Sequence, residues 1–304
     1  SSQKWTNKAI LNDSKIRDLI EHLSKRKLGN KDYPADLMGD AYEILLKKFA
    51  DDSKAQAGEF YTPRSVVRLL VHILDPQPGE TVYDPACGSG GMLIEAIRYM
   101  HDDSLCCGSI FGQEKNVVNA AIAKMNLFLH GASDFNVMQG DTLRDPKILQ
   151  GGNIAKFDCV IANPPFSLEN WGATEWSSDK YKRNIYGTPS DSCGDYAWIQ
   201  HMICSMSSGK GRMAVVMPQG ILFRGNQEAE IRKQLVESDL IEAVVTLGDK
   251  LFYGTGLSPC FLIIRRMKPA HHSGRILMID GSKILTQKRA QNILAENDID
   301  RLYS

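Results

Sequence analysis

From residue 58 onward, short apolar runs alternate with segments that have helical spacing, and this alternation restricts the possible fold more than any other feature. Apolar strands separated by helices are typical of a parallel sheet that helices cover on both faces. Two of the intervening helices are predicted at Gly91–Met100 and Val117–Leu129. The pattern predicts an α/β fold with a doubly wound, Rossmann-like sheet of about seven strands, mostly parallel. The predicted strands are Thr81–Tyr83, Ser109–Gln113, Asn136–Gln139, Phe157–Ala162, Arg212–Met217, Ala243–Leu247 and Cys260–Ile264.

The first 57 residues have a different pattern, without strand-like alternation. Apolar residues recur there at the i, i+3, i+4 and i+7 spacing of one helix face. We therefore predict a small N-terminal helical region at 1–57 and a catalytic α/β domain at 58–304. The residues that carry the two helical patterns are Ile16, Leu19, Ile20 and Leu23, and then Leu37, Ala41, Ile44, Leu45 and Phe49.

The composition is ordinary for a soluble globular protein, with 43% hydrophobic and 24% charged residues. No stretch approaches the ~20 apolar residues that a bilayer span needs, and the first residues lack the apolar core of a signal peptide. We expect a cytoplasmic protein without a membrane segment. The seven cysteines and seven histidines form no CxxC, HxxxH or HExxH spacing, so we predict no disulfide framework and no metal site. Lys+Arg and Asp+Glu both number 36, and zero net charge disfavours an autonomous nucleic-acid binder.

A glycine-rich turn, DPACGSGG, runs from Asp84 to Gly91 between a predicted strand and a predicted helix. Glycines there permit a tight turn and let a ligand approach the backbone, at the place where doubly wound sheets bind ligands. The spacing is neither GxGxxG nor that of a P-loop. Taken alone, the turn leaves NAD, a nucleotide and S-adenosylmethionine open as ligands. Cys87 lies within it, and we expect its side chain to pack in the core.

Two acids follow the next two predicted strands. Glu114 ends the second strand, where a carboxylate can accept both hydroxyls of a ribose, and Asp141 ends the third, where it can accept from an adenine amino group. Each acid alone is more often a surface or capping residue. Together with Asp84, they place acids at three successive strand ends, a joint pattern that those ordinary roles explain poorly.

The motif Asn163-Pro164-Pro165-Phe166 follows the apolar strand at 157–162. Its two prolines end the strand and stiffen the turn, because each fixes φ and lacks an N–H donor. An adenine amino group is a poor nucleophile, since its lone pair is delocalised into the ring. The Asn163 side-chain carbonyl and the Pro164 backbone carbonyl can each accept one amino hydrogen and so direct that lone pair at an electrophilic methyl group. Phe166 can stack on a flipped base. As an alternative, the motif is only a strand-terminating turn.

The order of these motifs is itself distinctive. GEFYTPR at 58–64, then DPACGSGGML, GQE, GDTL and NPPF, resembles the modification subunit of type I restriction–modification systems, over most of residues 36–267. The resemblance implies a Rossmann-like methyltransferase sheet and an S-adenosylmethionine-dependent DNA adenine-N6 methyltransferase. It implies a cofactor site of Phe60, Tyr61, Thr62, Asp84, Cys87, Gly88, Gly90, Glu114 and Asp141, and a target-base site of Asn163, Pro164, Pro165 and Phe166. Phe252 resembles a position near the target pocket.

The resemblance also implies partners: double-stranded DNA, a specificity subunit, a restriction subunit and a second copy of the chain. Zero net charge and few residues after the last predicted strand favour a separate specificity subunit that reads the DNA sequence. In the long polar segment at 167–192, Lys180, Lys182 and Arg183 are candidates for phosphate contacts, or else belong to a solvated loop. The helical regions at both ends are shorter than is usual in the family, so a truncated chain or a compact relative is expected.

Three other functions use the same features. The NPPF chemistry also suits methyl transfer to a protein glutamine amide or to a ribosomal RNA base. A catalytically silent assembly subunit is disfavoured by the intact Asn163–Phe166, Glu114 and Asp141. An NAD-dependent oxidoreductase is disfavoured by the glycine spacing and leaves NPPF without a role.

Overall fold

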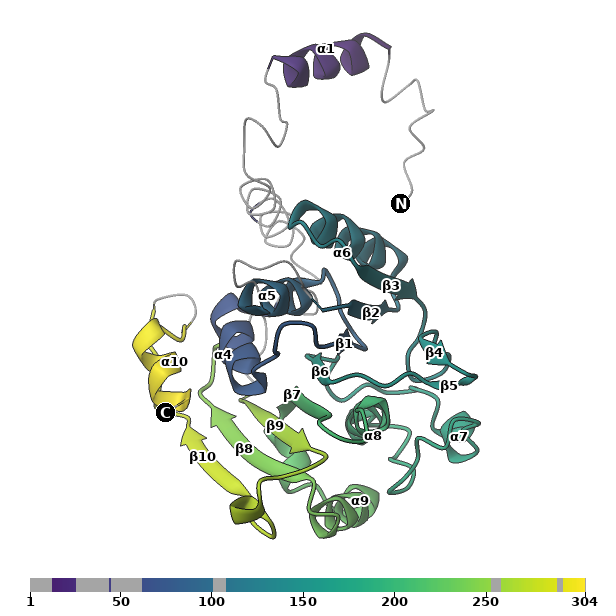
Figure 1. The fold of residues 1–304 in the computed structure, drawn as a ribbon, viewed down its shortest axis with the longest axis vertical. Coiled ribbons are helices and arrows are strands. Elements are labelled where there is room, and N and C mark those ends of the chain that lie inside the picture. The colour runs from purple at the N-terminus through teal and green to yellow at the C-terminus, as the bar shows by residue number, and fades with distance from the viewer. Residues whose placement is uncertain are drawn as a thin grey trace.

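The protein folds around one mixed sheet with helices on both faces (Figure 1). A computed structural model describes residues 13–25, 44, 62–100, 108–252, 258–288 and 292–303. Its α-helices are α1 (Asp13–Ser24), α4 (Arg64–Leu74), α5 (Gly91–Met100), α6 (Val117–Leu129), α7 (Ala173–Ser177), α8 (Asp195–Ser205), α9 (Asn226–Glu237) and α10 (Glu296–Tyr303), and two 3₁₀ helices are η1 (Gln219–Leu222) and η2 (Ala270–His272). The strands are β1 (Val82–Asp84), β2 (Ile110–Glu114), β3 (Phe135–Gln139), β4 (Leu149–Gln150), β5 (Asn153–Ile154), β6 (Cys159–Ala162), β7 (Arg212–Pro218), β8 (Ile241–Leu247), β9 (Pro259–Arg265) and β10 (Leu277–Gly281).

Eight strands form the main sheet, in the order β10-β8-β9-β7-β6-β1-β2-β3. β9 runs antiparallel to its neighbours β7 and β8, and the other neighbouring pairs are parallel. The mostly parallel α/β sheet is confirmed, and each of the seven predicted strands is present. The prediction missed the edge strand β10 and the short hairpin of β4 and β5. β10 had a usable signal, an apolar run at 276–279 between two glycines.

Side chains of the central strands alternate between two buried layers. In β7, Met213, Val215 and Met217 pack into the layer that α8 and α9 cover, whereas Ala214 and Val216 pack into the layer of α4, α5, α6 and α10. Successive side chains of a strand point to opposite faces of a sheet, so a strand covered on both faces is apolar throughout. All seven residues of β7 are accordingly buried.

In the N-terminal region, the first apolar pattern, at 16–23, falls within the helix α1. The second pattern, at 37–49, lies outside the described residues except for Ile44, which is helical. Among the described helices, none is both long enough and apolar enough to cross a membrane.

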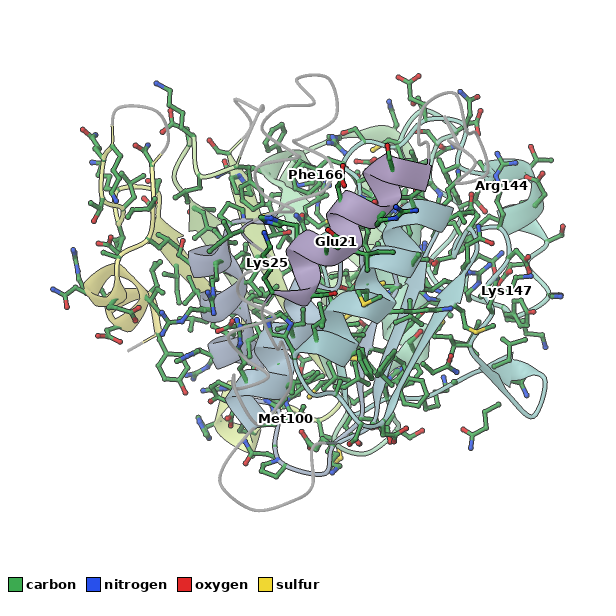
Figure 2. The ribbon with its side chains drawn as sticks, turned by 90° about the horizontal axis from the view of Figure 1, so that it is seen from above. Glu21, Lys25, Met100, Arg144, Lys147 and Phe166 are labelled. Carbon is green, nitrogen blue, oxygen red and sulfur yellow. The ribbon has the colours of Figure 1, made fainter. Side chains whose placement is uncertain are left out.

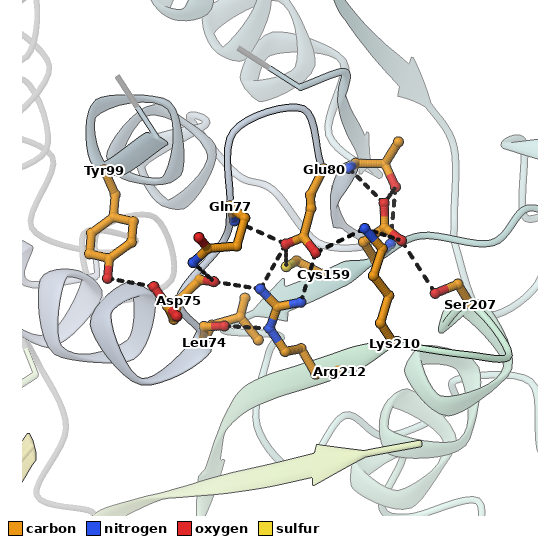
Figure 3. Close-up of polar contacts among 11 residues, drawn as sticks. Leu74, Asp75, Gln77, Glu80, Tyr99, Cys159, Ser207, Lys210 and Arg212 are labelled. Atoms are coloured by element: carbon orange, nitrogen blue, oxygen red, sulfur yellow. Dashed lines mark hydrogen bonds and ion pairs between the residues drawn. The ribbon is translucent and has the colours of Figure 1, made fainter. Parts of the chain in front are cut away.

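A buried ionic network holds the amino-terminal edge of the sheet together (Figure 3). The Arg212 guanidinium, at the start of β7, contacts both oxygens of Glu80 at 2.7 and 3.2 Å and donates through Nε to the Leu74 carbonyl that ends α4. Beside them, an Asp158 oxygen accepts from the backbone and hydroxyl of Thr81. Burial would raise the pKa of Glu80, but hydrogen bonds from Arg212 and the Gln77 backbone outweigh it and lower this pKa to about 2. This edge is structural, because the network links strand starts to a helix end.

Candidate active site

The predicted site residues meet at the opposite, carboxyl-terminal edge. β1 lies between β6 and β2, so the chain moves outward from β1 through β2 to β3 and later returns to the other side of β1 (Figure 1). Such a reversal opens a crevice beyond the strand ends, where doubly wound sheets bind ligands. Asp84 ends β1, Glu114 ends β2, Asp141 follows β3 and Asn163 follows β6. The fold thus brings four positions, spread over 80 residues of sequence, to one sheet edge.

The glycine-rich turn has a backbone conformation that explains its composition. Gly88 and Gly90 have φ of +54° and +85°, a left-handed region that strains other residues. The Cys87 amide donates to the Gln113 carbonyl at 3.0 Å and so ties the turn to β2. A Cβ at Gly88 would meet no atom of the described residues within 4 Å, so among these residues the backbone there faces open space that a ligand can approach. The Cys87 thiol points inward instead: it is 5% exposed, and burial raises its pKa well above the usual value.

Asp84 contacts the backbone of the glycine-rich turn. Its side chain is 2% exposed, and its Oδ1 accepts from the Ala86 amide at 2.9 Å. Its pKa is raised to about 8, mainly by burial, with a lowering effect of the Ala86 hydrogen bond and a further raising effect of the nearby Glu114 carboxylate. The fold therefore favours the neutral form of Asp84 more than water would. The Thr142 hydroxyl donates to the Pro85 carbonyl at 2.6 Å and joins the turn to the loop after β3.

Glu114 bridges two backbone segments at this sheet edge. Its Oε2 accepts from the Gly88 amide at 2.9 Å and its Oε1 from the Asn116 amide at 2.7 Å. An ionised carboxylate offers about four lone-pair directions, so both oxygens can also accept from ligand hydroxyls. The half-buried carboxylate is held in the place that the sequence predicted for a ribose contact.

Asp141 is more exposed and has an ionic partner. Its Oδ2 lies 2.9 Å from Lys115 Nζ, and its Oδ1 accepts from the Arg144 amide at 3.3 Å. The Lys115 side chain is 72% exposed, and exposed pairs contribute only about 0–1 kcal/mol. Asp141 can therefore exchange this partner for a neutral amino donor at little cost. Figure 2 shows Arg144 and Lys147, further along the same loop, on one margin of the molecule.

Asn163 presents an unused acceptor. Its Nδ2 donates to the Thr62 hydroxyl at 2.8 Å, which turns the side-chain carbonyl away from Thr62. Its Oδ1 is buried and has no hydrogen-bond partner among the described residues. Burying an unsatisfied acceptor costs about 1–3 kcal/mol, so the arrangement fits a ligand that donates a hydrogen. Thr62, predicted as a cofactor contact, thus contacts Asn163, while Phe60 and Tyr61 lie outside the described residues.

The rest of the motif forms a rigid turn with an aromatic ring at its end. Pro164 is buried, Pro165 is exposed, and Phe166, labelled in Figure 2, is half-buried. The Phe166 ring lies 6.4 Å from that of Phe252, which follows β8 and is 7% exposed. The fold therefore brings Phe252 next to the motif.

Arg183 was predicted as a candidate phosphate contact, and this prediction is wrong. The residue is 1% exposed, and its guanidinium is held by Asp179 at 2.8 and 2.9 Å and by the carbonyls of Thr142 and Leu143. It also lies 4.4 Å from the buried Trp176 ring. Arg183 fastens the 167–192 segment to the loop after β3, whereas Lys180 and Lys182 remain exposed. A single sequence does not distinguish a buried arginine in a polar segment from a solvated one.

Asp195 and Arg224, which the sequence did not single out, contact Ser167, directly after the Asn163–Phe166 turn. The Ser167 amide donates to Asp195 at the start of α8, and Arg224 contacts both Asp195 and the Ser167 hydroxyl. The sequence has a weak signal for them, because each is a charged residue beside a glycine, Gly194 or Gly225.

The sheet order, the glycine-rich turn and the motif after β6 define a Rossmann-like methyltransferase fold. A structure described as a putative class I S-adenosylmethionine-dependent methyltransferase from Listeria monocytogenes shares this fold, with a TM-score of 0.68 and 17% identity, covering 89% of this chain and 80% of that one. The chain belongs to the N-6 DNA methylase family, whose sequence model matches residues 33–304.

Relatives make this family assignment more specific. The chain is 37% identical to the type I restriction enzyme MjaVII methylase subunit of Methanocaldococcus jannaschii, covering 94% of this chain and 50% of the relative. It is 34% identical to the type I restriction enzyme HindI methylase subunit of Haemophilus influenzae, covering 82% of this chain and 55% of the relative. The structure of a type I restriction-modification system methyltransferase subunit from Streptococcus thermophilus matches with a TM-score of 0.81 and 30% identity. The match covers 95% of this chain and 60% of that one. The chain thus spans about half the length of these curated relatives.

Proposed function

We propose that this chain carries the catalytic part of a type I modification subunit and transfers a methyl group from S-adenosylmethionine to the N6 amino group of a flipped adenine in DNA. The observation that carries the proposal is the buried Asn163 Oδ1 without a partner among the described residues, at the reversal point of a methyltransferase sheet. The division into a helical region at 1–57 and a catalytic domain at 58–304 is part of this proposal.

The proposed cofactor site fits the group it is assigned. The open backbone at Gly88 suits the methionine end, Glu114 the ribose hydroxyls and Asp141 the adenine amino group. Thr62 borders the target-base position, and Phe60, Tyr61, Asp84, Cys87 and Gly90 complete the proposed site. When bound, S-adenosylmethionine supplies an electrophilic methyl group.

The residues of the motif supply orientation. Asn163 Oδ1 accepts one hydrogen of the target amino group and the Pro164 carbonyl accepts the other. These two bonds hold the nitrogen closer to tetrahedral and direct its lone pair toward the methyl group. Pro165 stiffens the turn and Phe166 stacks on the base. Orientation of this kind lowers the barrier without a covalent nucleophile.

We further propose that site recognition depends on partners. The chain has zero net charge, and the buried Arg183 removes one of the cations predicted to contact phosphate. Related chains are described as methylase subunits of restriction enzymes, and one matching structure, with a TM-score of 0.73, comes from work on complex assembly of a type I system. We infer that a specificity subunit, a restriction subunit and a second copy of the chain complete the enzyme in the cytoplasm.

The test is transfer of labelled methyl from S-adenosylmethionine to unmethylated DNA, with and without the cognate specificity subunit. We expect N6-methyladenine with the subunit present, and about a 100- to 1,000-fold lower rate in Asn163→Ala, the usual effect of losing one such transition-state hydrogen bond. Asn136→Ala, an exposed asparagine on β3, serves as the control that keeps its activity. Label in RNA or in a protein glutamine, with none in DNA, would transfer the proposal to those substrates.

A further inference from the structure

The turn formed by Asn163–Phe166, here called the catalytic turn, is held by residues outside the motif. Directly after Phe166, Ser167 has φ of +49°, a left-handed conformation that is strained for a serine. Such a residue persists only where surrounding contacts enforce it. The two prolines stiffen the turn before Phe166, so the position of the Phe166 ring depends on what fixes Ser167.

Asp195 fixes the backbone of Ser167. Its Oδ1 accepts from the Ser167 amide at 2.7 Å, and the Gly194 amide donates to the Leu168 carbonyl at 2.9 Å. Asp195 is fully buried and lies in the first turn of α8, where the helix dipole favours a negative charge. α8 itself packs under the sheet, so this anchor is rigid.

Arg224 completes the contact from a third element, the connection between η1 and α9. Its Nη1 lies 2.6 Å from Asp195 Oδ2, and its Nη2 donates to the Ser167 hydroxyl at 3.2 Å. The Arg224 backbone is anchored in turn, because Arg232 donates to its carbonyl at 2.9 Å. The guanidinium therefore contacts both the side chain of Ser167 and the carboxylate that binds its amide.

We propose that Asp195 and Arg224 are positioning residues for the catalytic turn: together they hold Ser167 in its strained conformation and thereby set where Asn163 and Phe166 meet the target base. This inference rests on the proposed function and adds two residues to it. Misplacement of a reacting group by about 1 Å can cost about 100-fold in rate. The pair acts on the rate of methyl transfer, since it contacts Ser167, which directly follows the target-base motif.

Three variants test the pair. Asp195→Asn keeps an oxygen that can accept from the Ser167 amide but turns an –NH₂ group toward the Arg224 guanidinium, donor against donor. Arg224→Gln removes the charge and leaves Asp195 buried. In the double variant the new glutamine carbonyl can accept from the new asparagine amide, which restores a neutral connection. Arg265→Gln is the control, because the Arg265 side chain is about as exposed as that of Arg224, at 31% and 28%, and its pair with Glu242 at 2.8 Å lies at the amino-terminal edge.

Each variant is measured as the full chain with its specificity subunit, for kcat at saturating DNA and cofactor, for S-adenosylmethionine affinity and for amide hydrogen exchange over 164–171. We expect each single variant to lose about 10- to 100-fold in kcat and to exchange faster in this segment, with cofactor affinity within about twofold. The double variant should regain at least about tenfold, and the control should match the wild type.

Two results would overturn the inference: kcat within about twofold of the wild type in both single variants, or a parallel loss of kcat and cofactor affinity without recovery in the double variant. A wild type that transfers no methyl group to DNA would refute the proposed function instead. In that case hydrogen exchange still decides whether the pair holds the turn, since exchange equal to that of the wild type contradicts it.

Discussion

Replacing Arg212 by methionine should destabilise the amino-terminal edge of the sheet while leaving the carboxyl-terminal site in place. Arg212 is 6% exposed and Glu80 is 5% exposed. The Arg212 guanidinium donates two hydrogen bonds to the Glu80 carboxylate, at 2.7 and 3.2 Å (Figure 3). Methionine retains an apolar stem of similar length. Glu80 would remain buried, with the Gln77 amide and the exposed Lys210 as its donors.

The magnitude follows from two independent routes. Removing one partner of a buried ion pair costs about 3–5 kcal/mol. Separately, a Glu80 pKa lowered from 4.5 to about 2 corresponds to about 3–4 kcal/mol, at about 1.4 kcal/mol for each unit. The second figure includes the bonds from Gln77 and Lys210, so we expect Arg212→Met to lower the free energy of unfolding by about 3 kcal/mol at pH 7.

The same network predicts a pH dependence with a definite sign. The folded-state pKa of Glu80 is depressed, so its stabilisation is present above the usual value of 4.5 and is lost as pH falls toward about 2. Arg212→Met should weaken this acid dependence, because it raises the folded-state pKa.

Urea unfolding followed by tryptophan fluorescence between pH 3 and pH 8 measures both effects. Arg265→Met is the control, since its pair with Glu242 is partly exposed and should contribute less than about 1 kcal/mol. If Arg212→Met lowers the free energy of unfolding by less than about 1 kcal/mol, or keeps the acid dependence of the wild type, the Arg212–Glu80 pair does not stabilise this edge as proposed.

Three further predictions concern the other edge. Glu114→Gln should weaken S-adenosylmethionine binding by about 10- to 100-fold in calorimetric titration, because hydrogen bonds to a charged group contribute about 1.5–3 kcal/mol; an affinity within threefold would contradict the ribose role. Arg183→Met should lower the free energy of unfolding by about 3–5 kcal/mol, since it removes the charged partner of Asp179, whose side chain is 6% exposed. Lys180→Met at an exposed position should change it by less than about 0.5 kcal/mol, and equal effects of the two variants would show that Arg183 is not an anchor. The Asp84 pKa is raised from 3.8 to about 8, mainly by burial, so the stability that Asp84 contributes is present below pH 3.8 and is lost as pH rises to about 8. The urea midpoint of Asp84→Asn should lack this decline with pH, and parallel curves for the variant and the wild type would contradict the prediction.

Much of the fold was predictable because buried parallel strands leave a strong local signal. β6 and β7 are buried at every residue, and both were predicted from continuous apolar runs. β10 was missed although its apolar run at 276–279 resembles that of a buried strand, and the structure places it at the sheet edge with Leu277 and Met278 exposed. The hairpin of β4 and β5 has two residues in each strand, too few for any periodicity.

The candidate site divides in the same way. Asp84, Glu114, Asp141 and Asn163 were selected because each follows a predicted strand, and parallel strands carry their carboxyl ends to one edge. Which acceptor stays free at that edge was not predictable, since it depends on Thr62, a residue 101 positions away that takes the Asn163 amide hydrogen.

The elements, the order of motifs along them and the chemistry that the motif residues can perform could be inferred from the sequence, because they depend on local spacing and residue type. How the charged side chains are used depends instead on the three-dimensional fold. Arg183, Asp195 and Arg224 read alike in the sequence as charged residues near glycines or in polar segments. Each is nevertheless held by a group from a distant segment: Arg183 by the Thr142 carbonyl, Asp195 by the Ser167 amide and Arg224 by the Ser167 hydroxyl. Burial removes water as a competing partner, so these long-range contacts, which local sequence does not specify, decide where each charge lies and which backbone it holds.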